Sequence, residues 1–252
     1  MPQPPNDLSK MFIPDECRFT PSRGFEVDAY RRAVLDNGIA LISFENKADA
    51  DGTVMKKIVD RLGIAAVHDR DGTSVWDVKY DESVDQENGT RSLTTKEFRL
   101  HTDGSFEVPP PTFVALYCVE PDQLGGGETL FVDGNKIRPL LSPATLKVLL
   151  EHDFEIKVPE EFFKGHNSVM ARVLNARGSF RFRKDLLKLD NCAPHLVQAV
   201  EELDQLINSD SQTKGIQLSK GQMVIFDNAR FFHGRRKIED QRRHLKRMWF
   251  HI

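Results

Sequence analysis

The chain has 252 residues, of which 39% are hydrophobic and 29% charged, and a formal net charge of -3. This length is sufficient for one domain with a sizeable core, and we expect residues 1–252 to form a single domain. The small negative charge excludes a bulk attraction to nucleic acid or membrane. No apolar run approaches the roughly 20 residues that span a bilayer. Residues 1–10 are rich in proline and polar side chains, without a signal-peptide core, so we expect a flexible tail on a cytoplasmic protein.

The opening quarter of the chain predicts short helices around one strand. We expect a helix over 28–36, a buried strand over 39–44 and an amphipathic helix over 53–62. From about 69 to 97 the sequence is polar and contains the turn signals Asp71-Gly72 and Asn88-Gly89. We expect a long, lid-like loop there, in which Trp76 supplies a wall of a substrate site.

Strand patterns dominate the rest of the chain. Strands are expected over 112–119, 128–132, 221–227 and 243–252, with helices over 143–150 and 196–207. Ser142-Pro143 has the residues of a helix start. Short strands after early helices favour a mainly β fold with flanking helices, namely a β-barrel or jelly roll. The cysteines Cys17, Cys118 and Cys192 form no CxxC pair, which argues against a zinc ribbon.

His101-Thr102-Asp103 places two metal-binding side chains two residues apart. In an extended strand both point to the same side and can reach one cation. Two histidines and one carboxylate on one face of a metal are typical of non-heme Fe(II) oxygenases. Alone, however, the His-x-Asp pattern is common by chance.

The third ligand comes from a distant segment. Residues 221–228 read as a strand that runs into a loop, and this loop carries His233. In the last strand, alternation places Arg243, Leu245, Arg247 and Trp249 on one face. An inward arginine can bind a carboxylate through two parallel hydrogen bonds.

These blocks resemble the TauD/TfdA-like, or clavaminate-synthase-like, Fe(II)/2-oxoglutarate dioxygenases. The resemblance rests on His101-Thr102-Asp103-Gly104, Gly126-Gly127-Glu128-Thr129-Leu130, Asp227-Asn228 followed by His233-Gly234-Arg235, and Asp240-Gln241-Arg242-Arg243. It covers the order and spacing of blocks from about residue 98 to the C-terminus. It implies a double-stranded β-helix, which agrees with the jelly roll expected from the strand pattern.

The resemblance also implies roles for individual residues. His101, Asp103 and His233 match the iron ligands. Arg243 and Thr129 match the residues that bind 2-oxoglutarate. Arg247 matches a position that binds an acidic group of the primary substrate in some members.

The implied activity is a dioxygenase that uses Fe(II), 2-oxoglutarate and O2 and releases succinate and carbon dioxide. Halogenating relatives lack the carboxylate at the position of Asp103, so hydroxylation, desaturation or ring closure is favoured. Glu97 lies four residues before His101 and is predicted to pair with a substrate amine, while Arg247 pairs with a substrate carboxylate. Together they suggest an amino acid or a related zwitterion.

Two alternatives remain open from the sequence. The first is a catalytically silent jelly-roll protein that captures a ligand, and the second is a cupin-type metalloenzyme without 2-oxoglutarate. A basic cluster near the C-terminus is interrupted by acidic residues and split between two strand faces, so we expect a small-molecule partner and no nucleic acid. His68 has no partner at a ligand spacing and is expected to be a surface or hydrogen-bonded residue. The sequence leaves the substrate and the oligomeric state open.

Overall fold

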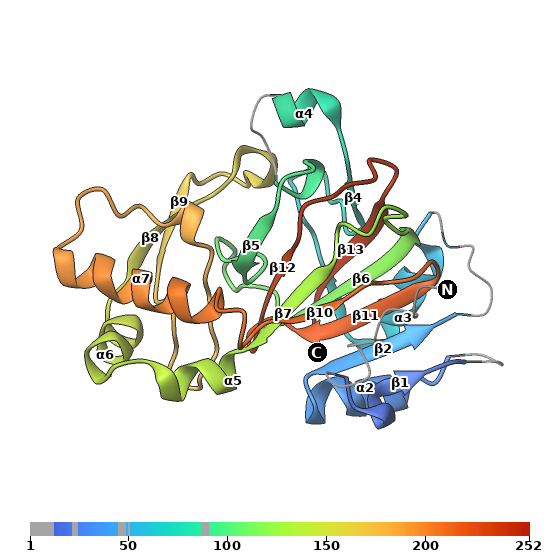
Figure 1. Ribbon diagram of the computed structural model, residues 1–252, viewed down its shortest axis with the longest axis horizontal. Coiled ribbons are helices and arrows are strands. Elements are labelled where there is room, and N and C mark those ends of the chain that lie inside the picture. The colour runs from blue at the N-terminus through green and yellow to red at the C-terminus, as the bar shows by residue number, and fades with distance from the viewer. Residues whose placement is uncertain (1–12, 22–24, 45–48, 50, 87–90) are drawn as a thin grey trace, which may run out of the picture.

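The computed structural model describes residues 13–21, 25–44, 49, 51–86 and 91–252. The predicted tail, 1–10, lies outside these residues. Two β-sheets form the centre of the molecule, and helices flank them (Figure 1). The mainly β fold with flanking helices is therefore confirmed. None of the helices in the described part of the chain combines the length and the apolar character of a membrane-spanning segment.

The larger sheet contains seven strands in the order β1-β2-β11-β6-β13-β3, with β4 also paired to β13. Their bounds are β1 Arg18–Phe19, β2 Ile39–Ser43, β3 Ile64–Ala66, β4 Trp76–Lys79, β6 Phe113–Glu120, β11 Gln222–Asp227 and β13 His244–His251. Strands β6 and β11 are apolar runs, and both of them and β13 are buried over most of their length. Helices α2 (Val27–Asp36) and α3 (Thr53–Leu62) pack against this sheet. Such two-sided covering explains why these strands lack the alternation of a half-exposed strand.

The smaller sheet has the order β10-β7-β12-β5, with bounds β5 Phe98–His101, β7 Thr129–Asp133, β10 Lys214–Ile216 and β12 Phe231–Arg235. One pocket is lined by side chains of both sheets, including His101 and Thr129 from the smaller sheet and Leu116 and Leu245 from the larger. The two sheets therefore face each other across this pocket. Phe131 and Phe226 meet edge to face between the sheets, with ring centroids 5.0 Å apart.

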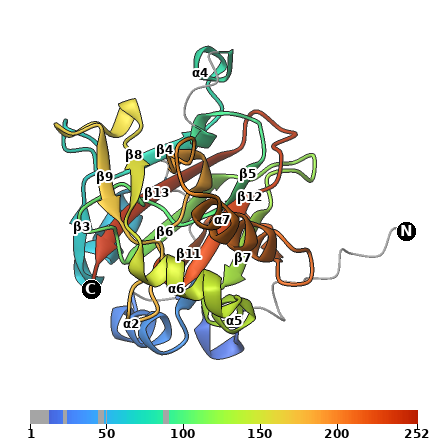
Figure 2. The ribbon, with the colours of Figure 1, turned by 90° about the vertical axis from the view of Figure 1, so that its left-hand side faces the viewer.

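The remaining elements lie to one side of the sheets. They are α5 (Gly134–Ile137), α6 (Pro143–Glu151), α7 (Pro194–Ile207) and the hairpin of β8 (Phe154–Lys157) with β9 (Ser168–Ala171). Figure 2 looks at this side, where α6 and α7 pack together in front of the sheets. Ser142 caps α6 by accepting a hydrogen bond from the Thr145 backbone N–H, as the Ser-Pro pattern predicts.

The segment 69–97, which we expected to be a loop, contains regular structure. β4 pairs with β13, and α4 (Glu82–Gln86) and the 3-10 turn η2 (Arg91–Leu93) follow it. The sequence Trp76–Lys79 is short and half polar, so its pairing with the last strand was not visible from local pattern. The role of this segment as a lid stays a prediction.

Candidate active site

His101, Asp103 and His233 converge as predicted. All three are buried, and one possible ligand atom of each lies within 4.8 Å of the others. His101 and His233 are cross-strand partners of β5 and β12, which brings their rings to a centroid distance of 4.5 Å. Two details of the prediction were wrong: His233 lies on strand β12 and not on a loop, and β5 ends at His101, so Asp103 belongs to the following turn.

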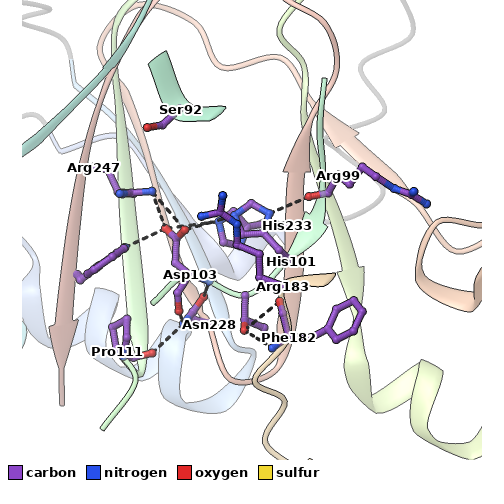
Figure 3. A network of polar contacts seen from close by, with 12 residues as sticks. Ser92, Arg99, His101, Asp103, Pro111, Phe182, Arg183, Asn228, His233 and Arg247 are labelled. Carbon is purple, nitrogen blue, oxygen red and sulfur yellow. Dashed lines mark hydrogen bonds and ion pairs between the residues drawn. The ribbon is translucent and has the colours of Figure 1, made fainter. Parts of the chain in front are cut away.

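Asp103 is positioned by Asn228, which follows β11. The Asn228 side chain accepts a hydrogen bond from the Asp103 backbone N–H at 2.8 Å and donates to the Asp103 carbonyl at 2.9 Å. It also donates to the carbonyl of Pro111 at 2.8 Å (Figure 3). Because Asp103 lies outside strand β5, the hydrogen bonds of the buried Asn228 amide fix its backbone and orient its side chain toward the histidines.

The proton of the His101 ring lies on Nδ1, so the lone pair of Nε2 points toward the Asp103 carboxylate. Its Nδ1 lies 2.8 Å from the Arg99 carbonyl, which can only accept, so Nδ1 carries a proton. Burial, followed by the neighbouring His233, lowers the pKa of His101 to about 4, so the ring is neutral near pH 7. Its Nε2 is then an acceptor 3.3 Å from Asp103 Oδ1. Two acceptors at this distance repel each other unless a cation lies between them.

The carboxylate of Asp103 is surrounded by donors. Arg247 Nη1 lies 3.2 Å from both carboxylate oxygens (Figure 3). Trp249 Nε1–H donates to Oδ2 at 2.9 Å. Burial by itself raises the pKa of this carboxyl, but the Arg247 cation and the contacts with His233 and His101 together outweigh it, so the pKa is held well below its usual value. Asp103 therefore stays ionised and oriented.

Arg247 makes a contact that its predicted role does not include. We expected it to bind a substrate anion, and its Nη1 lies 3.2 Å from the carboxylate of Asp103, one of the predicted metal ligands. Its Nε and Nη2 are buried and have no hydrogen-bond partner. These two atoms form the edge of the guanidinium that can bind a carboxylate with two hydrogen bonds. The substrate role of Arg247 stays a prediction.

Arg243 lines the same pocket as the two histidines and Asp103, and we call this pocket the inner pocket. Its lining residues are Val78, Ser92, Phe98, His101, Asp103, Leu116, Thr129, His233, Gly234, Arg235, Arg243, Leu245 and Arg247. The Arg243 side chain packs on Gly127, where an added Cβ would come within 2.5 Å of Cδ. Among the described residues no carboxylate lies within 4.0 Å of its guanidinium, and its buried Nη1 has no partner. Burial lowers the pKa of Arg243 to about 10, so it remains a cation.

The two ends of the inner pocket are thus chemically complementary to one kind of ligand. Three buried donors suit a divalent transition metal and leave positions open for further ligands. A buried, unpaired guanidinium beside Thr129 suits the carboxylate of a ligand that also reaches the metal. The residues present therefore fit an Fe(II) ion and a diacid such as 2-oxoglutarate.

Comparisons with known proteins agree with this arrangement. The family described as "Taurine catabolism dioxygenase TauD, TfdA family" matches residues 25–249. The chain belongs to this TauD/TfdA family.

Individual relatives are more distant. The chain is 27% identical over 173 residues to L-asparagine oxygenase of Streptomyces coelicolor, covering 68% of this chain and 51% of that one. It is 28% identical over 188 residues to clavaminate synthase 2 of Streptomyces clavuligerus, covering 69% and 55%. The chain thus spans about half the length of these curated relatives.

Solved structures confirm the jelly-roll fold of this TauD-family chain. Asparagine oxygenase in complex with Fe(II), 2S,3S-3-hydroxyasparagine and succinate has a TM-score of 0.74 and 19% identity, covering 89% of this chain and 77% of that one. The non-heme iron oxygenase OrfP in complex with Fe, succinate and (3S)-hydroxy-L-Arg has a TM-score of 0.69 and 17% identity, covering 89% and 79%. At these identities the likeness shows the shared fold.

The predicted substrate residues Glu97 and Trp76 lie apart from each other. Glu97 is exposed on a second, outer pocket of about 440 Å³, which shares Phe98 and His101 with the inner pocket. Trp76 is half-buried, lines neither pocket and donates its Nε1–H to Ser92 Oγ at 3.3 Å. Their contact with a substrate stays a prediction.

An aromatic cluster encloses Arg247 and was not predicted from the sequence. Its members are in ring contact with one another: His68, Trp76, Phe106, Phe162 and Trp249. Arg247 lies over the Trp249 ring at 4.7 Å. His68, expected at the surface or hydrogen-bonded, is fully buried; its Nδ1 lies 3.2 Å from the Thr73 carbonyl, and its Nε2 has no partner. The pairing of β3 and β4 with the last strand brings His68 and Trp76 next to Arg247 and Trp249.

We predict that Trp249→Phe weakens divalent-metal binding about tenfold, because loss of a hydrogen bond to a ligand typically costs 10–100-fold in metal affinity. The measurement is calorimetric titration with Mn(II). Phe106→Leu is the control, since it perturbs the same aromatic cluster without removing a bond to Asp103. Equal dissociation constants for Trp249→Phe and the wild type would contradict the assignment.

Proposed function

We propose that this protein is an Fe(II)/2-oxoglutarate-dependent dioxygenase that hydroxylates an amino acid or a closely related zwitterion. The observation that carries the proposal is the pairing, in one pocket, of the His101–Asp103–His233 group with the unpaired, buried guanidinium of Arg243. Membership of the TauD/TfdA family and the bound iron and succinate of the related structures support it.

Different residues of the pocket bind Fe(II) and 2-oxoglutarate. His101, Asp103 and His233 hold the metal, with Arg247 and Trp249 keeping the carboxylate oriented. Arg243 and Thr129 would hold the distal carboxylate of 2-oxoglutarate in the pocket that His101, Asp103 and His233 also line. Bound Fe(II) supplies the oxidising chemistry with O2, and the protein supplies orientation and the exclusion of water.

The substrate class follows from the charges that remain available. The Nε and Nη2 atoms of Arg247 would donate two hydrogen bonds to a substrate carboxylate. Glu97 on the outer pocket has no ion-pair partner within 4.0 Å among the described residues, and it is available to a substrate cation. The names of two structural relatives point to the same class, since one holds hydroxyasparagine and the other hydroxyarginine.

The alternatives are less well supported. Buried cations are normally paired, and an unpaired one costs several kcal/mol in a folded chain. In a cupin-type metalloenzyme without 2-oxoglutarate, Arg243 would have no anion to bind. In a catalytically silent binding protein, the His101–Asp103–His233 group would have no function.

We predict that Arg243→Met raises the KM for 2-oxoglutarate by about 30-fold or more, because breaking a buried charge pair costs 2–5 kcal/mol. Succinate release is measured against 2-oxoglutarate concentration. Arg242→Met is the matched control, because the neighbouring Arg242 is 74% exposed and pairs with Asp240. An unchanged KM in Arg243→Met would exclude this arginine from the cosubstrate site.

The substrate assignment is tested by substrate-dependent succinate formation with a panel of L-amino acids that includes asparagine and arginine. With the amino acid that is turned over, Glu97→Gln and Arg247→Met each raise the KM for that substrate about tenfold or more, since each removes a charge-assisted contact. Glu97→Gln leaves the KM for 2-oxoglutarate unchanged. If both variants retain the wild-type KM for the amino acid, the zwitterion hypothesis is wrong.

A further inference from the structure

Arg235 is a buried arginine to which neither metal binding nor the predicted cosubstrate contacts assign a role. It lies two residues after His233 on β12, and both side chains line the inner pocket. Its Nη2 donates to three backbone carbonyls, those of Arg91 at 3.3 Å, Thr94 at 2.8 Å and Lys96 at 2.7 Å. One guanidinium nitrogen thereby fastens the whole turn that precedes β5.

The fastened segment, 91–97, forms a wall of both pockets. Ser92 lines the inner pocket, while Arg91 and Glu97 line the outer pocket. The segment is also held by backbone hydrogen bonds from Asp81 N–H to the Leu93 carbonyl at 2.9 Å and from Ile238 N–H to the Thr95 carbonyl at 2.8 Å, and by the Trp76 side chain on Ser92. Arg235 supplies the only contacts among these that come from a side chain lining the inner pocket and that reach from Arg91 to Lys96.

The other side of Arg235 faces the cosubstrate end of the inner pocket. Its cross-strand partner is Thr129, and it lines the pocket together with Arg243. Its Nε is buried and has no hydrogen-bond partner, and among the described residues no carboxylate lies within 4.0 Å of its guanidinium. Burial, and then the neighbouring Arg243 cation, lower the pKa of Arg235 to about 9. Two buried cations thus share this end of the pocket without an anion.

We propose that Arg235 is a positioning residue that couples binding of a dicarboxylate in the inner pocket to ordering of segment 91–97. This inference rests on the proposed function, because the dicarboxylate is 2-oxoglutarate. A ligand carboxylate between Arg243 and Arg235 reduces the repulsion between the two cations and fixes the Arg235 guanidinium. The three carbonyls it holds, and with them the wall that carries Glu97, are fixed at the same time.

A purely structural role of Arg235 predicts a different result. If Arg235 only held the turn, its loss would loosen segment 91–97 equally with and without 2-oxoglutarate. Coupling requires instead that 2-oxoglutarate stabilises the segment in the wild type and not in the variant. Couplings between sites in proteins are typically 5–150-fold.

The test is amide hydrogen exchange of segment 91–97 with Mn(II) alone and with Mn(II) plus 2-oxoglutarate. We expect 2-oxoglutarate to slow exchange about tenfold in the wild type and to leave it unchanged in Arg235→Gln. Arg235→Lys keeps the charge but not the three-carbonyl geometry, so it retains 2-oxoglutarate affinity and loses the slowing. Arg236→Gln is the matched control, because the adjacent Arg236 is exposed and pairs with Glu128, and it behaves as the wild type.

The outcomes separate this inference from the proposed function. Slowing that persists in Arg235→Gln overturns the coupling, as does a wild type that binds 2-oxoglutarate by calorimetry without any slowing. Failure of the wild type to bind 2-oxoglutarate in the presence of Mn(II) overturns the proposed function and this inference with it.

Discussion

The buried carboxylate of Asp103 is the charge on which the rest of the site depends. An isolated buried anion is strongly unfavourable, so the fold must surround it with donors or a cation. Arg247 and Trp249 supply donors on one side, and the Nε2 atoms of His101 and His233 lie on the other. The donors keep the carboxylate ionised, and the acceptor Nε2 of His101 beside it creates a place that a cation fills well.

The facing sheets distribute the remaining charges around this carboxylate. The smaller sheet supplies the histidines and Thr129, and the last strand of the larger sheet, with the turn before it, supplies Arg243 and Arg247. Because the arginines reach the pocket from the opposite sheet, a ligand between the sheets contacts the metal residues and the cations together. Arg235 extends the same system to the outer pocket through the backbone of segment 91–97.

Local sequence predicted those parts of the structure that local interactions determine. Helix α3 has its predicted bounds, and α6 starts at the Ser142 cap, because amphipathic periodicity and capping act within a few residues. The alternation of the last strand correctly placed Arg243, Leu245 and Arg247 on one pocket. The metal-ligand group was found because three residues of suitable chemistry belong to an ordered set of motifs.

The features that sequence missed depend on contacts across long stretches of chain. Asn228 orients Asp103 from 125 residues away, and no local pattern reveals that bond. β12 looked like a loop because Gly234 and Arg235 interrupt its apolar run, yet its pairing with β5 and β7 makes it a strand. The attachment of Arg247 to Asp103 likewise follows from the facing of two sheets and not from its own strand.

The central claim is that one pocket holds both a metal and 2-oxoglutarate. Its most direct test is the visible spectrum of the protein under anaerobic conditions with Fe(II), before and after addition of 2-oxoglutarate. The account predicts a weak charge-transfer band that requires both additions and is absent in His233→Ala. A protein that binds Fe(II) but shows no band at saturating 2-oxoglutarate would contradict it.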